Sequence, residues 1–337
     1  MEPKHCYLRN VVAEYGSATR TNDDLVASNP GWSAASILSK VGISSRPVAI
    51  QGESAVDLAE RAGARCLASA QCDVSSVDAL IMVTQSPDYV LPSSACILQH
   101  RLGLPDTVAA FDVGLGCSGF NYGLWLARSI IFSGQGRRVL LICSETYSRY
   151  CDIHDLSTVS LFGDGAAALL LQSDSEEAIA YVGESLLGTD GSGAGSLIVE
   201  DGGGRSRSLG LSPTGSRHTL AMDGPRVFRF ALDRAYSTCN GLLTKIELGW
   251  DDIDIVLCHQ ANRLMLQTLQ RQFGLNEERM PVDVLHVGNL STASLPVHVA
   301  RTLASGKLDK VSHSLAVGFG VGFSWGATHI RWLINRQ

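Results

Sequence analysis

One cysteine stands where its thiol could act as a nucleophile. Cys117 follows an apolar, strand-like run, lies between Gly116 and Gly119, and precedes an apolar, helix-like stretch over residues 120–132. The partial positive charge and free N–H groups of a helix N-terminus favour a thiolate, and the glycines let a substrate approach the backbone. This arrangement suits acyl transfer through a covalent thioester. A buried structural cysteine is the alternative for this segment.

The same glycines match a dinucleotide-binding pattern. Gly114, Gly116 and Gly119 satisfy G-x-G-x-x-G, and Glu145 ends the next strand-like run. The match lies in the middle of the chain and puts a cysteine where a pyrophosphate needs bare backbone. Acyl chemistry is therefore the favoured interpretation.

The composition excludes several classes of function. A net charge of -6 without a run of Lys or Arg argues against nucleic acid as a partner. No apolar run approaches the length that spans a bilayer, and the first residues do not read as a signal peptide. Nine cysteines without C-x-x-C pairs or metal-ligand spacing indicate free thiols in a reducing compartment. We therefore expect a cytoplasmic protein with no metal site, no disulfide and no membrane partner.

The chain repeats one pattern of strands and helices at an offset of roughly 170 residues. The paired segments are 55–70 with 226–246, 77–85 with 253–260, 111–114 with 282–285, and 162–171 with 323–332. Alternating helices and continuous Val/Ile/Leu strands predict buried sheets covered by helices. We expect two duplicated α/β halves, residues 1–172 with the nucleophile and residues 173–337.

Two polar residues of the second half could complete a site with Cys117. His259 ends a strand-like run, and Asn289 lies in a Gly/Ser/Thr-rich loop that leads into a helix. In two pseudo-symmetric halves, strand ends of this kind can converge on one cleft. Each residue also has a structural explanation, His259 as a satisfied strand-end residue and Asn289 as a turn former.

With these motifs the sequence resembles the β-ketoacyl-acyl-carrier-protein synthase III family of thiolase-like condensing enzymes. The resemblance covers nearly the whole chain and rests on ordered motifs at residues 20–25, 92–96, 110–120, 161–166, 259–262, 288–289 and 318–326. It implies a thiolase-like fold, two pseudo-symmetric α/β halves in a layered αβαβα arrangement, and a homodimer. It also implies that Cys117, His259 and Asn289 are the catalytic residues.

The resemblance implies a two-stage reaction. Cys117 takes an acyl group from acyl-coenzyme A (acyl-CoA) or an acyl-acyl-carrier protein, while the backbone N–H groups of Cys117 and Val321 form an oxyanion hole. Malonyl-acyl-carrier protein then loses carbon dioxide, and His259 and Asn289 stabilise the enolate. The carbanion attacks the acyl-enzyme and releases a β-ketoacyl thioester for fatty acid or specialised-metabolite biosynthesis. Two neutral donors serve the enolate, so no cofactor is expected.

Several positions depart from the family pattern. Leu156 stands where an Arg usually stacks on the CoA adenine, although the Trp partner of that stack is kept as Trp32. Leu91 replaces an aromatic that often closes the acyl pocket across the dimer. Leu264 replaces an Arg that helps to dock the carrier protein, and Val321 replaces a glycine. These departures indicate a specialised synthase for a secondary metabolite or a medium-chain acyl group, with ordinary divergence of a housekeeping enzyme as the alternative.

The resemblance implies further substrate-binding residues and leaves related activities open. Gly224 and Phe228 match a region that lines the substrate tunnel, and Asn262 belongs to the motif that begins at His259. The thiolase reaction is disfavoured, because residues 319–322 contain no second cysteine. A type III polyketide synthase-like enzyme, an acyltransferase that esterifies a hydroxyl or amine, and a non-catalytic partner subunit remain the alternatives.

Overall fold

Helices and strands alternate along most of the chain in the computed structural model, which describes residues 5–210 and 218–333. The strands are β1 (Tyr7–Tyr15), β2 (Ala18–Thr21), β3 (Ser45–Val48), β4 (Ala79–Val83), β5 (Ala109–Val113), β6 (Arg138–Thr146), β7 (Asp164–Gln172), β8 (Ala180–Thr189), β9 (Leu197–Ile198), β10 (Ala221–Met222), β11 (Ile255–Cys258), β12 (His313–Gly320) and β13 (Ser324–Trp332). The helices are α1 (Asn22–Ala27), α2 (Ala34–Val41), α3 (Ala55–Ser69), α4 (Ser94–Arg101), α5 (Gly119–Ser133), α6 (Leu156–Val159), α7 (Gly204–Ser208), α8 (Gly224–Lys245), α9 (Arg263–Phe273) and α10 (Ser294–Ala304).

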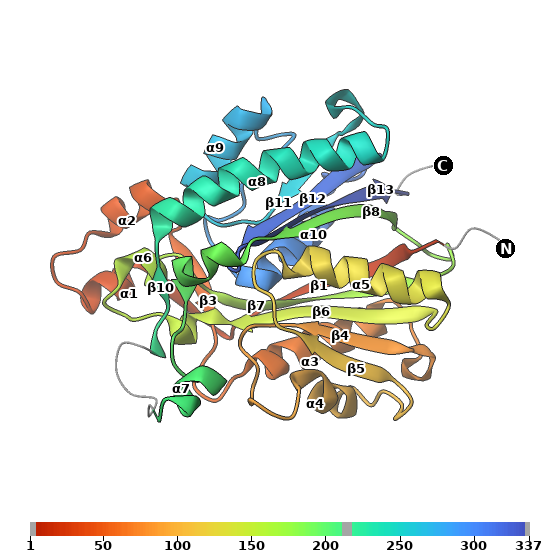
Figure 1. Cartoon of the computed structure of the whole chain (residues 1–337), viewed down its shortest axis with the longest axis horizontal. Coiled ribbons are helices and arrows are strands. Elements are labelled where there is room, and N and C mark those ends of the chain that lie inside the picture. The colour runs from red at the N-terminus through yellow and green to blue at the C-terminus, as the bar shows by residue number, and fades with distance from the viewer. Residues whose placement is uncertain (1–4, 211–217, 334–337) are drawn as a thin grey trace.

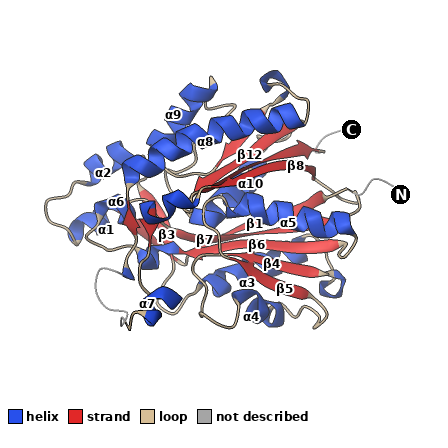
Figure 2. Ribbon diagram, in the orientation of Figure 1, coloured by secondary structure: helices blue, strands red, loops and turns tan. Residues whose placement is uncertain are grey.

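The main strands form one sheet in the order β11-β12-β13-β8-β1-β7-β6-β4-β5. The first half supplies β1 and β4–β7, the second supplies β8 and β11–β13, and a short pairing of Tyr7 and Leu8 with Tyr181 and Ala180 joins them. Helices α3 and α4 cover the strands of the first half, and α8 covers those of the second with α9 beside it. Helices α5 and α10 contact strands of both halves (Figures 1 and 2). The predicted layered αβαβα arrangement is therefore confirmed.

Strand β4 shows why the central strands are apolar throughout. All five of its residues are buried. Successive side chains point to opposite faces of a strand. Ile81 and Val83 therefore join the core that contains α5, whereas Leu80 and Met82 join the core under α3. A strand with helices on both faces has no solvent side, which explains the continuous hydrophobic run.

Most of the paired segments adopt matching elements, α3 with α8, β4 with β11, and β7 with β13, but one expected strand is wrong. Residues 282–285 form no strand. Pro281, just before them, has no N–H to donate to a ladder. The N–H of Asp283 instead donates to Gln260 Oε1 at 2.7 Å, and the Asp283 carboxylate pairs with Arg301. The boundary between the halves, predicted after residue 172, stays a prediction.

Gly163 lies where the first half closely approaches the loop that carries Asn289. Its N–H donates to the Asn289 carbonyl at 3.0 Å, and an added Cβ would lie 2.7 Å from the Pro47 carbonyl oxygen. Gly163→Ala should therefore lower the free energy of unfolding by about 1–3 kcal/mol, measured by urea denaturation. Gly195→Ala is the matched control, because a Cβ there meets nothing within 4 Å. Equal stability of the two variants would contradict the close approach.

Candidate active site

Cys117 lies in the turn between β5 and α5, as the sequence predicts, and its side chain is buried. Strand β12 of the other half lies directly against it. A Cβ added to Gly320 would be 2.7 Å from Cys117 Cβ and 3.3 Å from its Sγ. The neighbouring Ser118 hydroxyl shares a hydrogen bond of 2.7 Å with the Ser324 hydroxyl at the start of β13. The nucleophile position is thus built from both halves of the chain.

His259 follows β11 and is held by β12. Its backbone N–H donates to the Val317 carbonyl at 2.8 Å, and its ring meets the edge of Phe319 with centroids 5.6 Å apart. The imidazole is buried, and its Nδ1 has no hydrogen-bond partner among the described residues. Because Gly320 of the same strand lies against Cys117, strand β12 brings the imidazole and the thiol to the same region.

Asn289 reaches the same region through its neighbours. Its backbone N–H donates to the Leu161 carbonyl at 2.9 Å, and its carbonyl accepts from Gly163 N–H. The side-chain Oδ1 accepts a hydrogen bond of 2.9 Å from the N–H of Ser291. The Ser291 hydroxyl in turn lies 3.9 Å from Cys117 Sγ. The segment that carries Asn289 therefore lies next to Cys117, and strand β12 contacts both Cys117 and His259, so the three predicted residues belong to three separate segments that meet in one region.

Burial controls the protonation of the thiol and the imidazole. It raises the pKa of Cys117 to about 12, against a lowering by the Ser291 hydrogen bond, and the Glu145 charge raises it further. Burial also lowers the pKa of His259 to about 3. Burial thus opposes the expected stabilisation of a thiolate by the helix N-terminus. Both shifts favour the neutral forms of the thiol and the imidazole, and a neutral imidazole can accept a proton.

The structure argues against the dinucleotide interpretation of this segment, because Gly116 and Gly119 lie in close packing, although Gly114 does not. A Cβ on Gly119 would lie 2.6 Å from Val83 Cγ1 and 2.9 Å from Thr292 Oγ1. Glu145, the acidic end of that pattern, is fully buried, and burial raises its pKa to about 8. Its carboxylate accepts hydrogen bonds from the N–H of Gln85 at 3.1 and 3.2 Å. An interior carboxylate of this kind is not placed to bind a ribose.

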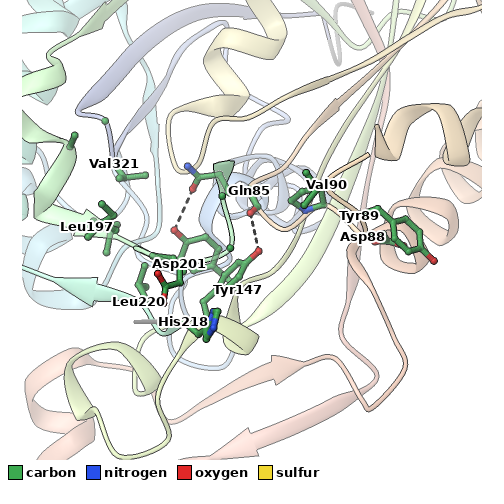
Figure 3. Close-up of a pocket in the computed structure, with 18 residues that line it drawn as sticks. Gln85, Asp88, Tyr89, Val90, Tyr147, Leu197, Asp201, His218, Leu220 and Val321 are labelled. Carbon is green, nitrogen blue, oxygen red and sulfur yellow. Dashed lines mark hydrogen bonds between the residues drawn. The ribbon is translucent and has the colours of Figure 1, made fainter. Parts of the chain in front are cut away.

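A cavity of about 680 Å³ opens beside this site (Figure 3). Val321 and Gly322 line it directly after Gly320, and Gln85, Tyr147 and Tyr150 line it from the first half. Sequence reasoning did not assign the last three residues to a site. Thr84 and Gln85 form the polar pair that ends the strand-like run 77–85. This pair could have indicated a binding site, because side chains at the carboxyl ends of parallel strands commonly face ligands.

Trp32 and Leu156 belong to the same part of the structure. Both side chains are half-buried and pack against a small apolar cluster of Leu25, Ile37 and Val159. The pairing of Trp32 with residue 156 in binding the donor stays a prediction.

The other predicted binding residues lie elsewhere. Gly224 and Phe228 line a second, more open cavity of about 500 Å³ at the start of α8, together with Leu264. Asn262 is the N-cap of α9, where its Oδ1 accepts from Met265 N–H at 2.9 Å. Leu91 is 79% exposed, so within one chain it closes no pocket.

The described residues contain neither a candidate metal site nor a candidate membrane-spanning helix. Over residues 5–210 and 218–333, no group of three or more His, Cys, Asp and Glu side chains could hold a metal ion. Within the same residues, no helix is long and apolar enough to cross a membrane.

The pH dependence of Cys117 alkylation tests whether burial or the helix N-terminus sets its protonation. Iodoacetamide labelling of Cys117 should accelerate about tenfold per pH unit from pH 7 to pH 9, because the thiolate is a minor form below a pKa of about 12. Mass spectrometry of pulse-labelled peptides measures the rate, and the exposed Cys96 serves as the internal control. A labelling rate that does not change between pH 7 and pH 9 would show that Cys117 is already a thiolate at pH 7, so that the effect of the helix N-terminus outweighs that of burial.

The chain is similar to condensing enzymes over almost its whole length. Residues 111–191 match the family model for 3-oxoacyl-[acyl-carrier-protein] synthase III, and residues 243–332 match the model for its C-terminal part. A β-ketoacyl-[acyl-carrier-protein] synthase III from Clostridioides difficile (strain 630) is 34% identical over 298 residues, which are 88% of this chain and 90% of that protein.

Solved structures agree with this result. A crystal structure of a 3-oxoacyl-(acyl-carrier-protein) synthase III has a TM-score of 0.91 and 36% identity, covering 97% of this chain and 100% of that one. The synthase from Burkholderia xenovorans LB400 has a TM-score of 0.87 and 34% identity, covering 97% of this chain and 94% of that one. The priming β-ketosynthase of the R1128 polyketide pathway has a TM-score of 0.88 and 27% identity, covering 98% and 97%. This chain, with its thiolase-like fold, therefore belongs to the 3-oxoacyl-[acyl-carrier-protein] synthase III family of condensing acyltransferases.

Proposed function

We propose that Cys117, His259 and Asn289 carry out acyl transfer followed by decarboxylative Claisen condensation with malonyl-acyl-carrier protein. The observation that supports this proposal is the approach of β12, which holds the backbone of His259 and packs against Cys117 at the start of α5. Acyl-CoA or an acyl-acyl-carrier protein supplies the first acyl group, and a β-ketoacyl thioester is the product.

In the first stage, Cys117 Sγ attacks the thioester carbonyl of the donor. The neutral His259 accepts the thiol proton and returns it to the leaving thiolate, so that the S–acyl bond to Cys117 forms as the bond to the donor sulfur breaks. The backbone N–H groups of Cys117 and Val321 receive the negative charge of the tetrahedral intermediate. Val321 borders the cavity beside Cys117, which supports this role.

In the second stage, the malonyl thioester loses carbon dioxide and becomes an enolate. Neutral His259 and the Asn289 amide can each donate a hydrogen bond to the enolate oxygen. The low pKa of His259 supports the role, because a buried imidazole that stays neutral neither gains nor loses a charge when the enolate forms. Two such donors suffice for the step, so we infer that no metal or organic cofactor takes part.

Two variants separate acyl loading from condensation. Cys117→Ala should abolish the gain of one acyl mass after mixing with an acyl donor, measured by intact-protein mass spectrometry. Asn289→Ala should still load the acyl group but slow decarboxylation of the malonyl thioester by at least about a hundredfold, because one enolate donor is lost. Condensation by Asn289→Ala at the wild-type rate would contradict the assigned role. Acyl transfer to a hydroxyl or amine would then be the better description.

The contact that the family usually makes with the adenine of an acyl-CoA donor is missing in this chain. Trp32 and Leu156 pack into an apolar cluster, so no guanidinium at residue 156 stacks on an adenine. A cation–π contact contributes about 0.5–2 kcal/mol. We therefore expect weak use of short acyl-CoA donors and better use of donors bound to a carrier protein. Such a donor preference would fit a specialised synthase better than a housekeeping one.

Leu156→Arg should lower the KM for acetyl- or propionyl-CoA a few-fold and leave kcat unchanged, because the surroundings of Cys117 are not altered. Leu156→Gln, which adds polarity without a cation, should leave the KM near the wild-type value. Steady-state condensation assays measure both. Saturation of the wild type at low micromolar acetyl-CoA would contradict the idea of a specialised donor.

A homodimer is the assembly that the chain supports. Strand β5 is the last strand of the sheet and pairs, among the described strands, with β4 alone. An open sheet edge is a template for pairing with another copy. Tyr89, Val90 and Leu91 are 60%, 68% and 79% exposed in one chain. Burial against a partner would remove this apolar surface from water.

A priming role in polyketide biosynthesis is the second candidate function. The similarity to the R1128 priming β-ketosynthase favours it, since that match covers 98% of this chain. Both functions use the same loading and condensation steps and differ in the acyl group that is loaded. Nine free cysteines further support a reducing, cytoplasmic location for either function.

A further inference from the structure

The cavity of about 680 Å³ lies next to the turn that carries Cys117. A Cβ on Gly116, the residue before Cys117, would lie 2.4 Å from Gln85 Oε1, so the Gln85 amide touches this turn. On the opposite side the wall is formed by Val321 and Gly322, which follow the residue packed on Cys117. A volume of about 680 Å³ is that of a small-molecule site. An acyl group on Cys117 would enter this cavity.

The walls of the cavity are of two kinds. One part is apolar and suits hydrocarbon, with Val90, Leu197, Val199 and Leu220 among its lining residues. Another part is polar, because the Tyr147 hydroxyl donates to Gln85 Oε1 (Figure 3) and the Tyr150 hydroxyl donates to the Gln85 carbonyl. A pocket for a plain alkyl chain needs no hydrogen-bonding group next to the thioester.

The Gln85 side chain is held in one orientation. Its backbone N–H donates to both carboxylate oxygens of the buried Glu145, and its carbonyl accepts from the Tyr150 hydroxyl at 3.2 Å. Its Oε1 accepts from the Tyr147 hydroxyl at 3.3 Å, which turns the amide nitrogen away from that ring (Figure 3). No described residue accepts a hydrogen bond from Nε2. A primary amide nitrogen has two N–H groups to donate, and in Gln85 both are available to a ligand in the cavity.

On the basis of the proposed function, we infer that the acyl group loaded on Cys117 carries a neutral oxygen near the thioester, as in a hydroxyacyl or oxoacyl group, and that Gln85 Nε2 donates a hydrogen bond to it. Gln85 is then the specificity-determining residue of the loading step, and Tyr147 is a positioning residue that orients the amide.

The described lining of the cavity offers little to pair with an acidic substituent. It includes no Lys or Arg, and His218 is the single basic side chain among the described lining residues. A carboxylate on the acyl chain would therefore lose water without gaining a strong cationic partner, which disfavours it. A hydroxyl or ketone oxygen accepts the same hydrogen bond without burying a charge. An alkyl chain would displace water from Nε2 and leave the donor unmatched, so a site of this kind discriminates against the deoxy analogue.

A matched series of four-carbon donors tests the inference on the full-length protein. Single-turnover loading of Cys117 is followed by intact-protein mass spectrometry with butyryl-, 3-hydroxybutyryl-, acetoacetyl- and succinyl-CoA, and with the same groups on the carrier protein. The wild type should load the hydroxy- or oxoacyl group at least tenfold faster than butyryl and load succinyl most slowly. Within each series all donors carry the same group, CoA or carrier protein, so the recognition of that group cancels in the ratio of loading rates.

Two variants assign the discrimination to its side chains. Gln85→Met keeps the length of the side chain but removes the donor, and it should make butyryl the faster substrate. Tyr147→Phe removes the hydroxyl that orients the amide and should reduce the hydroxyacyl preference to a smaller extent. A hydroxyacyl preference that survives in Gln85→Met would overturn the role of Gln85.

The outcomes separate this inference from the proposed function. Wild-type loading of butyryl as fast as the oxygenated donors would contradict the inference and leave acyl loading on Cys117 intact. Failure of every donor, on CoA and on carrier protein, to acylate Cys117 would contradict the proposed function and the inference with it.

Discussion

The close contact between the first turn of α5 and strands β12 and β13 is the constraint on which the site depends. A Cβ on Gly318 would lie 2.9 Å from the Cys117 carbonyl oxygen, and one on Gly320 would lie 2.7 Å from Cys117 Cβ. Asn121, in the first turn of α5, donates through Nδ2 to the Ala316 carbonyl at 2.8 Å. Helix α5 belongs to the first half and β12 to the second. The site therefore exists only when the two halves are packed, and the duplicated fold is a requirement of the chemistry.

The same packing decides the electrostatics of the nucleophile. Burial raises the pKa of Cys117 and lowers that of His259, so both shifts favour the uncharged groups. A helix N-terminus acts in the opposite direction on the thiol. Burying a neutral thiol and a neutral imidazole costs less than burying a thiolate and an imidazolium. Under the proposed function, the negative charge then develops on the substrate oxygen, where backbone N–H groups can receive it, rather than on a resting thiolate.

Local patterns in the sequence explain what could be predicted. The run of apolar residues before Cys117 and the glycines around it specify a strand, a turn and a helix from within about twenty residues. Residues 282–285 alternate in the same way but form no strand, because Pro281 and the distant Gln260 intervene. The Gln85–Tyr147 contact joins residues 62 positions apart. Such contacts depend on how loops of different strands meet, which no local pattern specifies.

Two features of this chain bear on the choice of donor. Leu156, which departs from the family pattern, packs like Trp32 against an apolar cluster in place of a cationic stack. Gln85 and Tyr147 form a polar part of the cavity wall. Neither feature involves the residues proposed for catalysis, so under the proposed function both act on recognition and not on the chemical step. Under the proposed function, selection of the donor then moves from the nucleotide to the acyl group. A synthase that selects by the acyl group suits a single dedicated starter better than a mixture of short acyl thioesters.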